Sequence, residues 1–193
     1  MHKILLASKN KNKLKEFQEI LNPLGFEVIS LASLNDEDEV VENGRTFEDN
    51  SLIKARYYYN KYHCDVVADD SGISLDYFNG FPGIYSARFM AHLDYPTKNQ
   101  LIVDMMKNIK NRGAHYTCDI ALIMNGEEHV FEGLWYGEIA DELKGSNGFG
   151  YDPIFYLPEY KMTSAELSRE TKNAISHRSI ALKKMVNYLE TKH

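Results

Sequence analysis

The first 24 residues constrain the fold more than any other part of this sequence. "KILLAS" (residues 3–8) is a short apolar run, and it passes through the polar "SKNKNK" (8–13) into a helical pattern that begins near Asn12. Apolar residues then recur at close to helical spacing, at Leu14, Phe17, Leu21 and Leu24. A buried strand that turns directly into an amphipathic helix is the usual start of an α/β unit, because each element buries its apolar face on the other.

The next segments repeat this alternation of strands and helices. "FEVIS" (26–30) and "DVVADD" (65–70) are typical of buried strands, and "SGISLDYF" (71–78) is expected to continue extended. A helix is predicted over 46–62, because Thr46 and Asp49 are spaced as a capping box. A further helical pattern covers 98–109.

The second half of the chain adds a hairpin and a last helix. Residues 114–124 and 128–139 alternate as two long paired strands, and Asn125-Gly126 is a strong hairpin turn signal. The C-terminal helix is predicted from the spacing of Leu182, Met185, Val186 and Leu189. Strands and helices that first alternate and then admit a hairpin predict an α/β fold with a mixed sheet.

Composition limits the classes of protein to which the chain can belong. A length of 193 residues fits one domain with a sizeable core, and no apolar run is long enough to span a membrane. The start of the chain lacks the pattern of a signal peptide, and Cys64 and Cys118 form no CxxC pair, so we expect a cytoplasmic protein without a disulfide framework. The net charge of −6 argues against nucleic acid as a partner, since that binding rests on many Lys and Arg contacts.

Two motifs lie where predicted strands end. "SKNKNK" places Ser8, Asn10 and Lys13 beside a helix N-terminus, which is a ready anion site, although a plain helix cap with solvated lysines explains the pattern as well. In "VVADDSG" (66–72), Asp69 and Asp70 point to opposite faces of their strand. A carboxylate at this position can bind Mg²⁺ or accept a proton, and the alternative is a turn cap.

A third set of polar residues belongs to the helix predicted over 46–62 and to its approach. Glu42, Glu48, Asn50 and Lys54 lie here, and the last two share one helix face. The solvated side of a helix explains this set equally well.

Cations stand at the predicted start of the last helix. Ser176 would cap that helix and put His177 and Arg178 in its first turn, where positive charge is unfavourable. This placement indicates either an accident of sequence or a ligand that is anionic or carries a carbonyl group.

"GSNGFGYDPIF" (145–155) combines three glycines with aromatic rings and an acid. Glycines let the backbone approach a flat ligand closely, and Phe149 could stack on a base while Asp152 accepts a hydrogen bond. The alternative is a decorated hairpin turn.

Taken together, these segments resemble the inosine triphosphate pyrophosphatase family. The motifs that carry the resemblance occur in order from Ser8 to Leu182: "SKNKNK", "VENGRTFEDNSLIKAR", "VADDSGISLD", "GFPGIYSARF", "NGFGYDPIF" and "ISHRSIAL". The resemblance implies Mg²⁺-dependent hydrolysis of ITP, dITP and XTP to the monophosphate and pyrophosphate, which keeps aberrant purines out of DNA and RNA. It also implies a single domain over 1–193, two-lobed, with a long curved mixed β-sheet flanked by helices and the active site in the cleft between the lobes. Members are homodimers in the cytosol.

The same resemblance assigns roles to residues of this chain. The triphosphate would be held by Ser8, Lys9, Asn10, Lys11, Asn12 and Lys13. Glu42 and Asp70 would bind Mg²⁺, with Asp70 also the catalytic base or an orienting group and Ser71 beside it touching substrate. The nucleoside would lie on Phe149, Gly150, Tyr151 and Asp152, and Lys172, His177 and Arg178 would complete the base and phosphate contacts. Two positions depart from the family pattern, Ser8 where threonine is common and Val41 where a second acid is common.

The chemistry of the bases agrees with these roles. Hypoxanthine and xanthine present a 6-keto acceptor, whereas adenine presents a 6-amino donor, so donors from Lys172 and Arg178 would select the former.

Four other functions fit parts of the pattern. They are a phosphomonoesterase phosphorylated on Asp69 or Asp70, a pyrophosphatase acting on modified pyrimidines, a non-catalytic nucleotide-binding module and, least well, a nucleic-acid binder.

Overall fold

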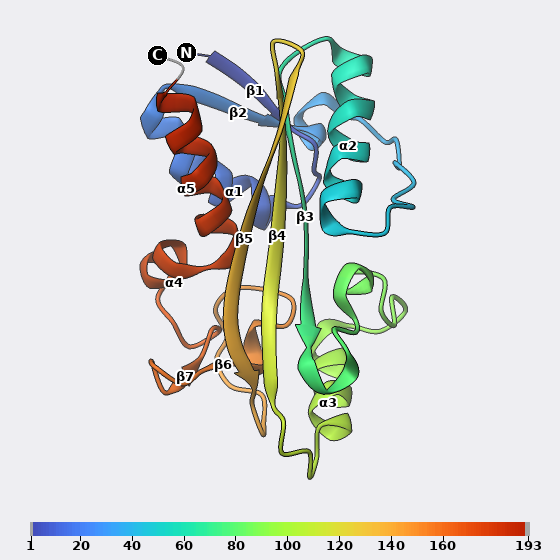
Figure 1. Ribbon diagram of the computed structural model, residues 1–193, viewed down its shortest axis with the longest axis vertical. Helices are drawn as coiled ribbons and strands as arrows, with labels where there is room; N and C mark the ends of the chain where they lie inside the picture. Colours follow the sequence, from blue (N-terminus) through green and yellow to red (C-terminus); the bar gives the residue numbers. More distant parts are fainter. Residues whose placement is uncertain (1, 192–193) are drawn as a thin grey trace. The chain divides into compact units, whose positions relative to one another are not determined.

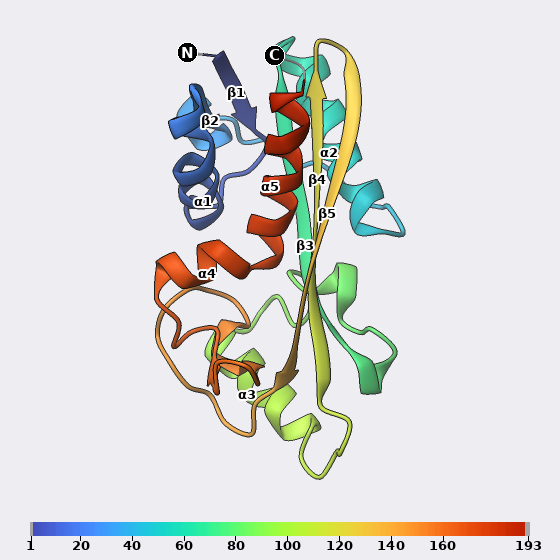
Figure 2. The same ribbon diagram turned by 60° about the vertical axis from the view of Figure 1, so that its left-hand side comes forward.

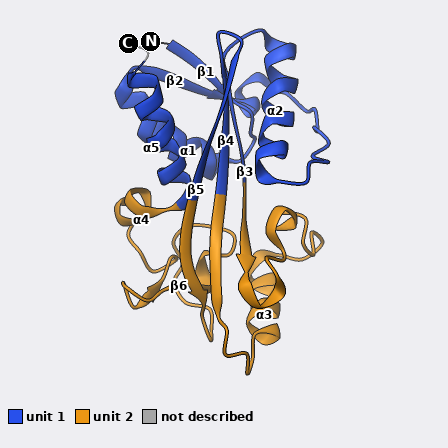
Figure 3. Ribbon diagram, in the orientation of Figure 1, with its two compact units in different colours: residues 1–70, 118–133, 177–193 blue, residues 71–117, 134–176 orange. Residues whose placement is uncertain are grey.

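A computed structural model describes residues 2–191 of the chain (Figure 1). Residues 1–70, 118–133 and 177–193 group into one compact unit, unit 1, and residues 71–117 and 134–176 into a second, unit 2 (Figure 3). Within 2–191 no helix is both long and apolar enough to cross a membrane.

The strands form one mixed sheet of seven, in the order β2-β1-β3-β4-β5-β6-β7. β1 pairs in parallel with β2 and with β3, whereas β6 is antiparallel to both β5 and β7. The strands are β1 (His2–Leu6), β2 (Phe26–Ser30), β3 (Val66–Leu75), β4 (Gly113–Met124), β5 (Glu127–Ile139), β6 (Phe155–Leu157) and β7 (Met162–Thr163). The predicted α/β class with a mixed sheet is confirmed.

Unit 1 has three layers. Its helices are α1 (Lys11–Leu21), α2 (Phe47–Tyr62) and α5 (His177–Glu190). α1 and α5 cover one face of the sheet and α2 covers the other (Figures 1 and 2). Because side chains alternate along a strand, Val67 of β3 faces the α1–α5 layer, while Val66 and Ala68 face α2. This alternation decides where the polar residues further along β3 point.

Unit 2 has its own core. Its helices are α3 (Tyr95–Met105) and α4 (Arg169–Ile175). Tyr116, Trp135 and Phe155 pack together, with ring centroids of Tyr116 and Phe155 4.7 Å apart, and Ile73 and Met106 are fully buried in the same cluster. This core supports the loop 145–155.

Most predicted elements are present with shifted ends. The capping box of Thr46 and Asp49 opens α2, and Asn125 and Gly126 both have positive φ in the hairpin turn. The first strand ends at Leu6 rather than residue 8, and α3 starts at Tyr95 rather than 98 because Asp94 caps it and Pro96 sits in its first turn.

One apolar position is predicted in the wrong element. Leu24 is not part of the first helix, which ends at Leu21, and it lies 44% exposed in a short 3₁₀ turn. Pro23 lies in the same turn, and a proline cannot donate the backbone hydrogen bond that would continue the α-helix.

Candidate active site

The polar turn after β1 forms the start of α1. Asn10 caps the helix, since its side-chain oxygen accepts hydrogen bonds from the backbone N–H of Asn12 (2.9 Å) and of Lys13 (3.2 Å). Ser8 Oγ accepts from the N–H of Asn10, and Lys9 Nζ donates to the carbonyl of Asp38. Lys9, Lys11 and Asn12 are exposed. The turn therefore gathers positive charge and a helix N-terminus at the carboxyl end of β1, as the anion-site hypothesis requires.

Asp69 is the centre of a buried ion cluster on the α1–α5 face of unit 1. Lys13 Nζ lies 3.0 Å from Asp69 Oδ1, and Arg178 donates from Nε (3.2 Å) and Nη2 (3.1 Å) to Asp69 Oδ2. Burial opposes ionisation, but Lys13 and Arg178 outweigh it and hold the pKa of the Asp69 carboxyl well below its usual value. Asp69 is therefore ionised, and its negative charge is the shared partner of Lys13 and Arg178.

Arg178 has a second acidic partner. Its Nη1 donates to Glu16 Oε2 of α1 at 2.5 Å, and the side chain is buried. Burial opposes the charge of the guanidinium, yet Asp69 and Glu16 raise its pKa above the ordinary value. The cation that is unfavourable at the first turn of α5 is thus compensated by two carboxylates from other elements of unit 1.

Asp70 points to the opposite face, toward α2. Asn50 Nδ2 donates to Asp70 Oδ2 at 3.0 Å, and Lys54 Nζ lies 3.9 Å from Asp70 Oδ1. Burial raises the pKa of Asp70, Lys54 lowers it and the nearby Glu42 raises it again, with a net rise. The pKa values of the two adjacent acids are therefore shifted in opposite directions. Asp69 is stabilised as a carboxylate, and Asp70 is made more basic.

Lys54 connects this acid to Glu42. Its ammonium lies 3.1 Å from Glu42 Oε1 and donates to the backbone carbonyl of Asp69 at 2.7 Å. Glu42 and Asp70 thus approach one point from two segments of unit 1.

The segment that carries Glu42 is tied to α2 on both sides. After Glu42, the N–H of Gly44 donates to Asn50 Oδ1, and a Cβ at Gly44 would lie 2.7 Å from that oxygen, so a larger residue would displace the segment. Before Glu42, Lys61 Nζ bridges Asp36 (2.7 Å) and Asp38 (2.6 Å). Glu42 is therefore placed by α2, not by its own surroundings in sequence.

In unit 2 the glycine-rich loop is built around Asp152. Its carboxylate accepts from Lys172 Nζ (2.5 Å), from the N–H of Phe149 (2.8 Å) and from Ser164 Oγ (2.8 Å). Gly148 has φ +75°, and a Cβ there would clash with Asp152 Oδ2. Only glycine fits at that position.

The aromatic residues of this loop have different settings. Phe149 is partly exposed, and the Lys172 ammonium lies 5.0 Å from its ring centroid. Tyr151 is buried in the core of unit 2, its hydroxyl donates to the carbonyl of Ser86, and burial raises its pKa. The ring of Phe149 is thus partly accessible, whereas the ring of Tyr151 anchors the loop. The carbonyl of Gly150 accepts from Asn99 of α3 at 2.9 Å.

Unit 1 holds most of the predicted site residues, namely Ser8 to Lys13, Glu42, Asp70, His177 and Arg178, and unit 2 holds Ser71, Phe149 to Asp152 and Lys172. Ser71 is partly exposed in β3, and His177 is buried at the start of α5.

Sequence reasoning misses several supporting residues. It gives Asp69 no role in the main hypothesis, and it does not consider Glu16, Ser164 and Asn99. Glu16 follows Lys13 by three residues on one helix face, which could have linked it to the same cluster. The partners of Ser164 and Asn99 are distant in sequence, and no local pattern reveals them.

The acids of unit 1 suit a hydrated divalent ion. In the described part of the chain, no three His, Cys, Asp or Glu side chains are grouped so that they could hold a metal by themselves. Glu42 and Asp70, however, lie around the same ammonium of Lys54. Mg²⁺ commonly binds one or two carboxylates and takes its other ligands from water and substrate phosphates. Glu42 and Asp70 therefore supply the one or two carboxylates that a Mg²⁺ ion takes from a protein.

A buried strand that carries two adjacent acids, with cations from three helices around them, gives this α/β protein a buried cluster of charged groups in unit 1. Residues 4–188 match the sequence model of the Ham1 family, and the chain belongs to that family. The resemblance drawn from the motifs is confirmed.

Individual relatives agree over almost the whole chain. A protein of Clostridium perfringens (strain 13 / Type A) named dITP/XTP pyrophosphatase is 44% identical over 98% of this chain and 98% of its own length. The solved structure of a HAM1 protein from Coxiella burnetii is 38% identical with a TM-score of 0.91, covering 99% of this chain and 100% of that one. The Staphylococcus aureus Ham1 protein is 37% identical with a TM-score of 0.90, over the same shares of the two chains.

Proposed function

We propose that this protein hydrolyses non-standard purine nucleoside triphosphates, ITP, dITP and XTP, to the monophosphate and pyrophosphate. The observation that supports this most is the pair Asp69–Asp70: Asp69 holds Lys13 and Arg178 on one face of β3, and Asp70 lies near Lys54, which also binds Glu42, on the other. Relatives named dITP/XTP pyrophosphatase point to the same reaction. Such a reaction removes aberrant purines from the nucleotide pool before they enter DNA or RNA.

Unit 1 supplies what a triphosphate needs. The start of α1 offers the positive end of a helix dipole, and Lys13 and Lys54 offer ammonium groups. Charge spread over the phosphoryl oxygens during hydrolysis is stabilised by such fixed cations.

Mg²⁺ is part of this proposal, with Glu42 and Asp70 as the residues that would hold it. When bound, the ion neutralises phosphate charge and polarises the phosphoryl group that is attacked. Asp70 orients the attacking water or accepts its proton, and the raised pKa of its carboxyl suits the second role.

Unit 2 supplies what a nucleoside needs. The partly exposed Phe149 offers a ring face for a base, and Gly148 lets the Asp152 carboxylate approach the loop beside it. Lys172, fixed by Asp152, provides a donor for the 6-keto oxygen that hypoxanthine and xanthine share.

The proposal is tested by a panel of nucleoside triphosphates with identification of the products. We expect ITP, dITP and XTP to be turned over at least about 10²-fold more efficiently than ATP, because an unpaired buried donor penalises adenine. The products should be the monophosphate and pyrophosphate, and excess chelator should stop the reaction.

Other products would point elsewhere. Orthophosphate as the first product would indicate a phosphomonoesterase acting through Asp69 or Asp70. Faster turnover of methylated pyrimidine triphosphates would indicate the pyrimidine-directed alternative, and binding without any hydrolysis would indicate a nucleotide-binding module.

The Phe149→Ala variant should weaken binding of the preferred substrate by about 1–3 kcal/mol, the range for a base stacked on an aromatic ring. The measurement is the KM, or the Kd of a non-hydrolysable analogue. The Tyr136→Ala variant is the matched control, because it removes a 68% exposed ring of unit 2 outside the loop. Equal binding by Phe149→Ala and wild type would exclude stacking on this ring.

The oligomeric state, the location in the cell and the lack of nucleic-acid binding stay predictions. A homodimer, a cytoplasmic location and the absence of nucleic-acid binding rest on the family resemblance and on the net charge of −6.

A further inference from the structure

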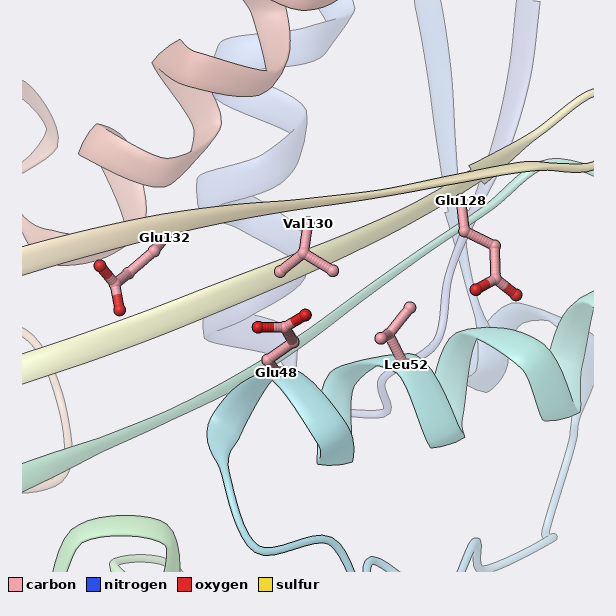
Figure 4. A pocket seen from close by; sticks show the side chains of 5 residues that line it. All are labelled: Glu48, Leu52, Glu128, Val130 and Glu132. Atoms are coloured by element: carbon pink, nitrogen blue, oxygen red, sulfur yellow. The ribbon is translucent and has the colours of Figure 1, made fainter.

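A second group of acids in unit 1 lines a pocket of about 470 Å³ beside α2. Glu48 and Leu52 come from α2, and Glu128, Val130 and Glu132 come from β5 (Figure 4). None of these residues belongs to the site proposed above.

The alternation of side chains along β4 places one more acid on the face of the sheet that α2 covers. On β4, Cys118 and Ile120 pack toward α1 and α5, whereas Ala121 packs toward α2. Asp119 therefore points toward α2, the same face as Val130 of β5. The charges of Glu132, Glu48 and Asp70 all raise the pKa of its carboxyl, in that order, so these acids are its close neighbours. Asp119 thus lies beside the pocket.

Asp119 is incompletely satisfied. The residue is 6% exposed, and its Oδ1 has no hydrogen-bond partner within residues 2–191. Burial, followed by the charges of Glu132 and Glu48, raises the pKa of Asp119 to about 7. A buried carboxylate oxygen without a partner is costly, and native structures usually supply one.

The three acids also lack a basic partner. Among the described residues, no lysine or arginine forms an ion pair with Glu48, Asp119 or Glu132. Glu128 at the other end of the pocket differs, since Arg56 binds both its oxygens at 2.8 and 2.6 Å. The uncompensated negative charge is therefore confined to the end of the pocket near Asp119.

We propose that Glu48, Asp119 and Glu132 form a second divalent-cation site, which takes a hydrated ion of the Mg²⁺ class. Carboxylate oxygens are the ligands that such hard cations prefer. Because the three side chains are not grouped tightly enough to hold a metal alone, the ion is bound through one or two of them and keeps several waters. The charge of Asp70 also acts on Asp119, but Glu42 and Asp70 differ from the three acids because Lys54 supplies positive charge to them. The second site does not depend on the proposed reaction.

The test counts bound Mn²⁺, used as a paramagnetic probe, by electron paramagnetic resonance at pH 8 without nucleotide. The Asp119→Asn variant should bind one ion fewer per chain than wild type, and the Glu132→Gln variant, whose altered residue is exposed, should bind that ion at least about tenfold more weakly. The Glu128→Gln variant is the matched control and should keep the ion, because Arg56 already neutralises that acid.

Asp70→Asn separates this site from the proposed catalytic one, since it should leave the pocket ion bound. Equal Mn²⁺ counts in wild type, Asp119→Asn and Glu132→Gln would overturn the proposal and leave the cluster as a proton-binding site. An equal loss in Glu128→Gln would also overturn it, because the binding would then reflect general negative charge. Thermal melting gives an independent reading: Mn²⁺ should raise the Tm of wild type by more than that of Asp119→Asn, which keeps only the ion at Glu42 and Asp70.

Discussion

Replacing Asp70 by asparagine should lower turnover of the preferred nucleoside triphosphate by about 10³-fold or more while the protein stays folded. Asparagine keeps the shape of the side chain and an oxygen for the hydrogen bond from Asn50. The change removes the negative charge that would share a cation with Glu42. It also removes the possible base, because of the two adjacent acids Asp69 and Asp70 only Asp70 has a raised pKa. The measurement is kcat under saturating Mg²⁺, together with a circular dichroism spectrum.

A matched change elsewhere controls for the loss of one carboxylate. Asp141→Asn alters an acid whose side chain is 92% exposed, and it should leave kcat within about twofold of wild type, because exposed charges contribute little. Wild-type turnover by Asp70→Asn would remove this residue from the reaction and, with it, the proposed role of the α2 face.

The elements that local patterns specify could be predicted from the sequence. The capping box at Thr46 and the turn at Asn125-Gly126 are determined by residues within a few positions of each other, and both are present. Leu24 shows the limit of periodicity, since it fits the helical spacing while the chain has already left the helix at Leu21. A pattern of apolar residues does not report where backbone hydrogen bonding stops.

The residue types of the candidate site could be predicted from the sequence, but the ion pairs between its acids and its cations could not. That Asp69 and Asp70 face opposite sides of β3 follows from strand geometry. Which cations each acid faces depends on contacts across more than a hundred residues, as between Asp69 and Arg178, and no local rule gives these. The residue pattern at Arg178 indicates either an accident of sequence or a ligand, whereas in the structure two carboxylates of unit 1 bind this side chain.

That pairing leads to the largest stability effect that we expect. Replacing Arg178 by methionine should lower the free energy of unfolding by about 3–5 kcal/mol, because it leaves Asp69 charged and buried with Lys13 as its remaining close cation. Methionine fills much of the same volume, so lost packing contributes little. The measurement is urea unfolding at pH 7.5, with the slope of the transition compared between variants.

A double variant separates charge from packing. Asp69→Asn combined with Arg178→Met removes the acid that has lost one of its two cations and should recover part of the lost stability, while Lys13 loses its carboxylate partner. The dependence on pH follows from the lowered pKa of Asp69. Its folded-state pKa lies below the ordinary 3.8, so its contribution in wild type is complete above about pH 4 and is lost as the pH falls further. In Arg178→Met this loss on acidification should be smaller. If Arg178→Met were as stable as wild type, Arg178 would not be required to stabilise the charge of Asp69. Lys13 alone would then have to keep this buried acid ionised.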